Sequence, residues 1–156
     1  MEATKNKYQD TRDFLNTVRK CGNRVDALVN RINYRKSLLN IRTSHYSNMP
    51  KAPKSSIRPM EDHIADLDAL EYELKQAMDE YLMAKIQVSD LIGHLECSDQ
   101  QLVMQKRYVD QKSWEEISQD MQYSVRWVQK LHGKALPILD AVWQSAGFSA
   151  DGENGP

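Results

Sequence analysis

The sequence has few of the residues that strands, tight turns and disulfide-bonded scaffolds require. It contains six Gly, two Phe and two Cys in 156 residues, and long runs of β-branched residues are absent. This composition argues against a β-sandwich or barrel and predicts an all-α fold. Cys21 and Cys97 lie far apart and match no metal-binding or redox spacing, so we expect free thiols in a reducing cytoplasm.

Several functional classes also lack their sequence signals. No apolar stretch reaches about 18 residues, and the polar start MEATKNKYQD has no secretory core, so we expect no membrane segment. His94 and Cys97 form a single H-x-x-C pair, whereas a structural zinc needs four ligands. No nucleophile elbow, phosphate-binding glycine loop or H-E-x-x-H motif occurs. We therefore predict no metal, no cofactor, no catalytic residue and no enzymatic activity.

Charge is divided unevenly along a chain whose formal net charge is only −1. Residues 1–58 hold 13 Lys or Arg against 4 Asp or Glu, residues 59–98 hold 2 against 10, and residues 99–156 hold 6 against 8. The basic and acidic blocks are adjacent, so they can neutralise each other if the chain folds back. We prefer this interpretation. In the alternative, the basic block also contacts nucleic-acid phosphates.

Two long segments have the apolar periodicity of helices. The first runs over about residues 10–42, and the second from Met60 to Leu95. Their apolar positions recur at alternating three- and four-residue spacing, as in a heptad seam, except that Arg35 occupies one such position in the first segment. The seam residues are Phe14, Val18, Cys21, Val25, Leu28, Ile32 and Leu39, followed by Leu67, Leu70, Leu74, Ala77, Tyr81, Ala84, Val88, Leu91 and Leu95. Gly22 interrupts the first helix at a cost of about 1 kcal/mol.

A loop rich in proline and serine, residues 43–59, separates these segments. A single apolar stripe is unstable in water, so each stripe must meet the other or that of a second copy. An antiparallel, coiled-coil-like hairpin over residues 10–95 satisfies this, and so does a homo-oligomer through the long helices. The sequence alone does not decide between them.

Residues 96–143 have the signals of a helix-turn-helix domain. Ser98 is the expected N-cap of a helix over 99–109, Ser113 and Glu116 form a capping box before WEEISQDM, and Ser124 caps VRWVQKLHGKAL. Five apolar residues fill the template that packs the two motif helices together: Ile117, Met121, Tyr123, Val128 and Leu131. Pro137 predicts a kink or break between Gly133 and Pro137, or alternatively the start of a new short helix, PILDAVWQ. The polar tail 147–156 is expected to be disordered.

These motifs carry a family resemblance. The stretch RYVDQKSWEEISQDMQYSVRWVQKLHGKAL, residues 107–136, resembles region 4 of bacterial sigma-70 factors, which reads the promoter −35 element. Over about residues 10–140, the chain is similar to a family of small phage and prophage proteins related to late-gene activators of the autolysin-regulator type. They share a basic N-terminal helix, a loop like SNMP and an acidic helix like HIADLDALEYEL. Members often carry Gly where this chain has Gln111 and Gln122.

The resemblance implies a DNA-contacting face on the second motif helix. Carried over residue by residue, that face comprises Ser124, Arg126, Gln129, Lys130, Gly133 and Lys134. The chemistry agrees, because Arg can bind guanine O6 and N7 together, Gln can pair with adenine N6 and N7, and residues 124–136 contain no acid. Trp114 and Trp127 are expected to pack beside the motif rather than stack on bases, and His132 is expected at the surface.

The sequence therefore predicts a phage-type transcription regulator that binds double-stranded DNA, with RNA polymerase as a further expected partner. One alternative is a small terminase subunit, which also joins a helix-turn-helix to oligomerising helices. A second alternative is an adaptor that binds polymerase and reads no DNA.

Overall fold

The computed structural model describes residues 8–45 and 60–146, and for 42–45 the backbone alone. In these residues every regular element is helical, as the composition predicts, and no strand occurs. They fall into two compact units. The first unit comprises the residues up to Lys20 together with those from Leu82 onward, and the second unit comprises Cys21–Tyr81. This division differs from the expected boundary at 95/96.

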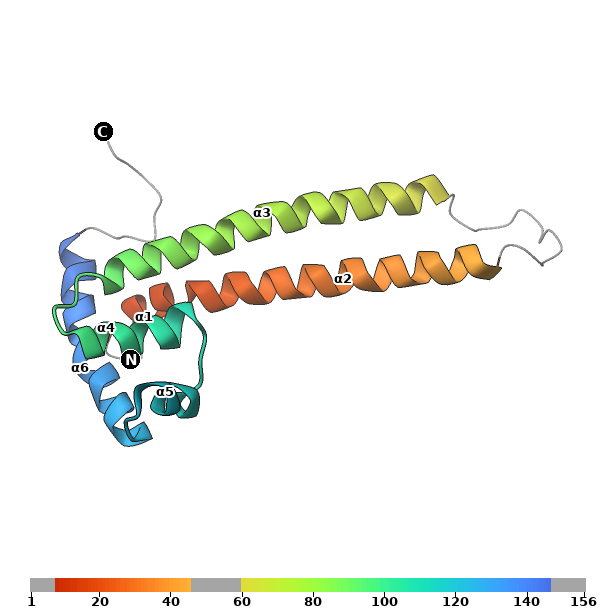
Figure 1. The fold of residues 1–156 in the computed structure, drawn as a ribbon. Coiled ribbons are helices and arrows are strands. Elements are labelled where there is room, and N and C mark those ends of the chain that lie inside the picture. Colours follow the sequence, from red (N-terminus) through yellow and green to blue (C-terminus); the bar gives the residue numbers. More distant parts are fainter. Residues whose placement is uncertain (1–7, 46–59, 147–156) are drawn as a thin grey trace, which may run out of the picture. The chain divides into compact units, whose positions relative to one another are not determined.

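Figure 1 shows the elements in chain order. They are α1 (Gln9–Leu15), α2 (Thr17–His45), α3 (Met60–Ile92), α4 (Ser98–Met104), the π-helical turn η1 (Gln105–Val109), α5 (Trp114–Met121) and α6 (Val125–Ser145). α2 continues to His45, into the predicted loop 43–59, and α3 ends three residues before the predicted Leu95. The remainder of that loop, residues 46–59, and the predicted disordered tail, 147–156, lie outside the described residues.

The first predicted long helix is in fact two helices, and the interruption lies at Asn16 rather than at Gly22. Asn16 is the C-cap of α1, with φ −82° and ψ −2°, and the Thr17 hydroxyl donates a hydrogen bond to the Phe14 carbonyl at 2.7 Å. Gly22 lies within α2, where an added Cβ would stand 3.2 Å from the Tyr81 ring. The glycine therefore permits a close approach instead of ending the helix.

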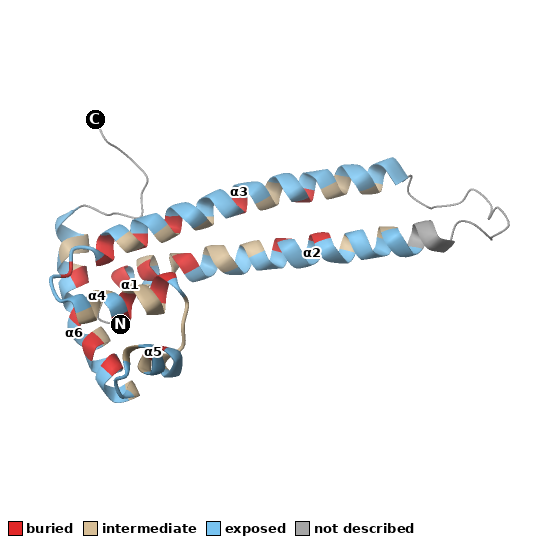
Figure 2. Cartoon of the chain, viewed as in Figure 1, coloured by how far each residue is buried: buried red, intermediate tan, exposed pale blue. Residues whose placement is uncertain are grey.

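In the second unit, α2 and α3 pack along the predicted seams. Leu28, Ile32, Leu70 and Ala77 form one buried cluster, to which Val25, Leu67 and Leu74 add half-buried side chains. All the predicted seam residues, in either unit, are buried or half-buried. Figure 2 shows that the buried residues occupy limited positions on each long helix and that most of the remaining surface is exposed. The apolar periodicity thus identified the packing residues correctly.

Ion pairs between the basic and acidic blocks give the direction of the pairing. Arg24 contacts Glu80 at 2.8 Å, and Lys36 contacts Glu71 at 3.1 Å, so later residues of α2 meet earlier residues of α3. The two helices therefore run antiparallel over the second unit. These side chains are about half exposed. Such exposed pairs add little to the free energy of unfolding. Their main effect is to favour the antiparallel register of α2 and α3 over other registers.

The first unit is assembled around α6. The buried Thr11 of α1 donates a hydrogen bond from its hydroxyl to Asp140 Oδ1 of α6 at 2.6 Å. α4 and α5 also pack against α6. The N-terminal helix thus belongs with the predicted DNA-binding motif, which the charge blocks and seam pattern did not indicate.

The predicted break between Gly133 and Pro137 is wrong, and so is the alternative of a new helix that begins at Pro137, because α6 is uninterrupted from Val125 to Ser145. Proline removes the hydrogen bond to the Gly133 carbonyl. Both Gly133 and Pro137 are exposed, so water can reach the group that loses its donor. Buried Leu136 and Leu139 lie on either side of Pro137, and their packing holds the helix through it.

Candidate nucleic-acid interface

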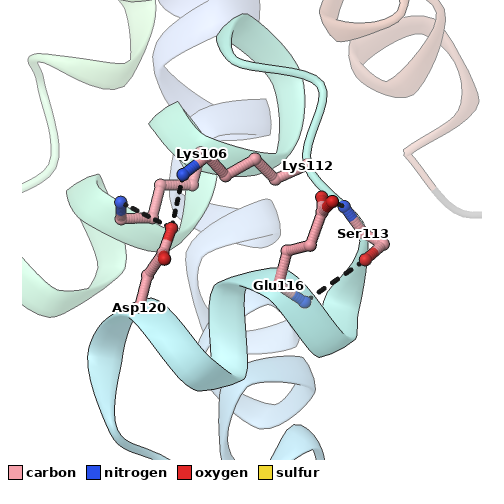
Figure 3. Close-up of polar contacts among 5 residues, drawn as sticks. All are labelled: Lys106, Lys112, Ser113, Glu116 and Asp120. Carbon is pink, nitrogen blue, oxygen red and sulfur yellow. Dashed lines mark hydrogen bonds and ion pairs between the residues drawn. The ribbon is translucent and has the colours of Figure 1, made fainter.

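The start of α5 is fixed by the capping box that the sequence predicts. The Glu116 backbone N–H donates to Ser113 Oγ at 3.2 Å, and the Ser113 backbone N–H donates to Glu116 Oε2 at 2.9 Å (Figure 3). Both donors are among those that a helix N-terminus leaves unpaired. This local chemistry determines where the first motif helix begins.

The turn between α5 and α6 is equally well defined. Gln122 has φ 57°, in the left-handed region where glycine is favoured. The Ser118 hydroxyl donates to the Tyr123 carbonyl at 2.5 Å, and the Trp127 backbone N–H donates to Ser124 Oγ at 3.1 Å. Ser124 is therefore the N-cap of α6, as predicted, and its place at the helix start brings it to the exposed surface.

A small core joins these helices to α4. Ile117, Val128 and Leu131 are buried in one cluster with Val103, and Trp114 and Met121 pack against it half-buried. Tyr123 departs from its predicted place in this core, since 38% of it is exposed. Its hydroxyl donates to Asp99 Oδ2 at 3.0 Å. Val103 of α4, which the apolar template did not include, is part of the buried cluster.

The helix before the motif begins one residue earlier than expected. Ser98 is the first residue of α4, and Cys97 occupies the N-cap position without a side-chain capping hydrogen bond. The helix continues through η1, and Gln111 then adopts φ 59°. The resemblance marked Gln111 and Gln122 as positions that often hold glycine, and the structure places both in the left-handed region.

A cluster of opposite charges ties this segment to α5. Asp120 accepts hydrogen bonds from Lys112 at 2.5 Å and from Lys106 at 3.2 Å (Figure 3). The hydrogen bond from Lys112, followed by that from Lys106, lowers the pKa of Asp120, and the same bond raises the pKa of Lys112. Two of the cations near the motif are thus already paired and are less available to phosphates.

The first turns of α6 carry a surface that we call the basic face. Its members, Arg126, Gln129, Lys130, Gly133 and Lys134, are all exposed. They recur at three- and four-residue spacing, so they share one side of the helix, and buried Val128 and Leu131 occupy the other. An added Cβ at Gly133 would meet nothing within 4 Å. The structure therefore brings the predicted contact residues together on an open surface.

The two tryptophans of the motif have different environments. Trp114 packs on the core as predicted, with the Arg107 guanidinium carbon 4.3 Å from its ring centroid. Trp127 is more exposed than expected, because 40% of its surface is accessible and it lies among the residues of the basic face. Its spacing of three and seven residues from Lys130 and Lys134 placed it on that face in the sequence already. His132, expected at the surface, is half-buried and lies edge-on to Trp114.

Comparisons of this chain with protein-family models, with curated proteins and with solved structures found no match. Within the two described stretches, none of the helices combines the length and apolar character needed to cross a bilayer. Over the same stretches, His, Cys, Asp and Glu side chains form no group of three that could hold a metal ion. The chemistry of the basic face is therefore the basis on which a function can be argued.

Proposed function

We propose that this chain binds double-stranded DNA sequence-specifically through α5 and α6, arranged as a helix-turn-helix, and acts as a transcription regulator of the phage type. The basic face carries this proposal. Arg126 and Gln129 have the hydrogen-bonding groups that read guanine and adenine edges, and Lys130 and Lys134 supply charge for phosphates. Binding, rather than catalysis, is the role that such a surface fits.

The support beneath this face favours readout by a rigid helix. Buried Val128 and Leu131 fix the rotation of α6 against Ile117, and the Ser124 cap fixes its first turn. The N-terminal residues of a recognition helix are those that contact base edges in a major groove. With the resemblance to sigma-70 region 4, this arrangement also makes RNA polymerase an expected second partner.

We further propose that α2 and α3 form an antiparallel hairpin within one chain in solution. The buried cluster around Leu28 and the ion pair of Arg24 with Glu80 support it. Pairing within one chain gives a melting temperature that does not change with protein concentration, whereas pairing between copies makes it rise with concentration. Thermal unfolding over a hundredfold concentration range separates the two.

The decisive experiment is a fluorescence-anisotropy titration of selected and scrambled duplexes at several salt concentrations. The Arg126→Ala, Lys130→Ala double variant should lose sequence preference and most of its affinity. A matched control, Lys20→Ala with Lys75→Ala, removes the same formal charge from exposed positions on other helices and should lose far less. Unchanged affinity of the first variant on every duplex, with folding intact, would exclude this helix as the DNA reader and favour the polymerase-binding adaptor.

A small terminase subunit is the second candidate, and one observation favours it. The second unit exposes large apolar side chains on both long helices, at Tyr34, Leu38, Ile64 and Tyr72. Exposed apolar side chains of this size are available for association with other copies, and terminase subunits assemble into closed rings. Mass measurement in solution tests this, because a ring of many copies supports packaging and a monomer or dimer contradicts it.

A further inference from the structure

Trp127 is the large apolar side chain within the basic face. It lies in the first turn of α6, between Arg126 and the exposed lysines, and 40% of its surface is exposed. Its side chain contributes nothing to the N-cap, which uses only its backbone N–H. An indole left in water on a polar, charged surface gains free energy when a partner covers it.

The ring is closely associated with both lysines of that face. Lys130 Nζ lies 5.5 Å and Lys134 Nζ 5.7 Å from the Trp127 ring centroid. Both distances fall within the range of about 6 Å over which an ammonium group is attracted to an aromatic ring. Whatever covers the indole must therefore also lie beside groups suited to phosphates, which points to the same DNA partner.

Duplex DNA offers an indole one kind of apolar contact in the major groove. Base faces are stacked and hidden, and base edges present donors and acceptors except for the C5-methyl group of thymine. We infer that Trp127 contacts the C5-methyl group of a thymine and so selects thymine at one position of the bound sequence. This inference rests on the proposed function and adds a specificity-determining residue to it.

A uracil scan of the selected duplex tests the contact directly. Each thymine is replaced singly by deoxyuridine, which removes the methyl group and keeps every hydrogen-bonding group. At one position the replacement should weaken binding of the wild-type chain about fourfold, the equivalent of one buried methyl group. Trp127→Ala should bind the thymine and uracil duplexes equally at that position.

A matched control uses a second exposed apolar residue on the same helix. Ile138 is 44% exposed and lies beyond the basic face. Ile138→Ala should therefore keep the uracil penalty of the wild-type chain. Circular dichroism confirms that each variant is folded, and the scan on the wild-type chain needs no variant at all.

Each remaining outcome is informative. If no uracil replacement weakens wild-type binding, or if the penalty persists in Trp127→Ala, the methyl contact is wrong while the proposed function stands. If the wild-type chain prefers DNA with unpaired bases, and that preference needs Trp127, the ring stacks on a base and the methyl contact is again wrong. If the wild-type chain does not distinguish the selected from the scrambled duplex, sequence-specific DNA binding itself fails.

Discussion

The Tyr108 hydroxyl lies 2.6 Å from His132 Nε2, a hydrogen bond that joins η1 to α6. The two rings are stacked, with centroids 5.6 Å apart. Burial is the main reason that the pKa of His132 falls to about 4, and the nearby Arg12 and Arg107 lower it further. Burial also raises the pKa of Tyr108. At neutral pH both rings are therefore uncharged within the first unit.

This pair makes stability depend on pH. Because the pKa of His132 in the folded chain lies below its ordinary value of 6.5, protons bind more readily to the unfolded chain. The contribution of uncharged His132 to the free energy of unfolding is complete above about pH 6.5 and is lost as the pH falls toward 4. Between pH 7 and 4.5 we expect the free energy of unfolding to fall by on the order of 2 kcal/mol from this group.

The control is His132→Gln, whose amide can accept the Tyr108 hydroxyl hydrogen bond but does not titrate. Urea unfolding at each pH should show a smaller acid loss for this variant than for the wild-type chain. Parallel pH profiles of the two proteins would contradict the assignment to His132, because carboxylates titrate identically in both.

The two left-handed glutamines give a prediction with an internal comparison. Gln122→Gly should raise stability by about 1 kcal/mol, because glycine adopts φ 57° without strain. Gln111→Gly should gain little or nothing. The Gln111 side chain donates to the Tyr108 carbonyl and accepts from Arg19, and glycine loses both hydrogen bonds. Thermal unfolding followed by circular dichroism measures both, and equal gains would show that these side-chain contacts are unimportant.

The packing of the second unit predicts a sharp contrast between neighbours. Leu28 is 3% exposed, so Leu28→Ala should cost about 3 kcal/mol of unfolding free energy. Val29 is 36% exposed, so Val29→Ala should change it by no more than about 0.5 kcal/mol. Leu28→Asp and Leu74→Asp should lower helix content and melting temperature, the first more because Leu74 is only half-buried. Unchanged stability in either aspartate variant would mean that the seam is misassigned.

On the basic face, base contacts and phosphate contacts should respond differently to substitution. Arg126→Ala and Gln129→Ala should each cost roughly 1–3 kcal/mol on the selected duplex and relax preference at one base pair. Lys134→Ala should weaken every duplex alike and reduce the slope of log affinity against log salt by about one. A uniform loss for all three variants would show that this surface attracts DNA without reading it.

The sequence predicted best what depends on neighbouring residues. The capping box of Ser113 with Glu116 and the Ser124 cap involve partners within three residues, and all three side chains lie as expected. Predictions that depend on distant contacts fared worse. Proline alone favours a break, but the packing of Leu136 and Leu139 outweighs it in α6. Tyr123 fits an apolar template, but Asp99, 24 residues away, draws its hydroxyl to the surface.

At the candidate site too, what depends on neighbouring residues was predicted better than what depends on distant contacts. Helical spacing predicted that Arg126, Lys130 and Lys134 share an exposed face, because spacing depends on backbone geometry alone. Trp127 was expected to pack beside the motif, but 40% of it is exposed near Lys130 and Lys134. The exposed fraction of a tryptophan at the edge of such a face depends on which other helices pack against it. Those contacts come from residues distant in the sequence, so helical spacing does not predict them.

The Thr11–Asp140 hydrogen bond has a mechanical consequence, because Asp140 lies on the same unbroken helix as Arg126. At about 1.5 Å per residue, α6 is roughly 30 Å long. The N-terminal helix contacts it near its C-terminal end, and the basic face lies near its N-terminal end. A shortened chain that began after Lys20 would lose the Thr11–Asp140 hydrogen bond and would also lack Leu15 and Val18, both fully buried, so the side chains that pack against them would be exposed. A fragment chosen only from the motif's own boundaries would therefore lose part of the packing that supports α6 and the basic face.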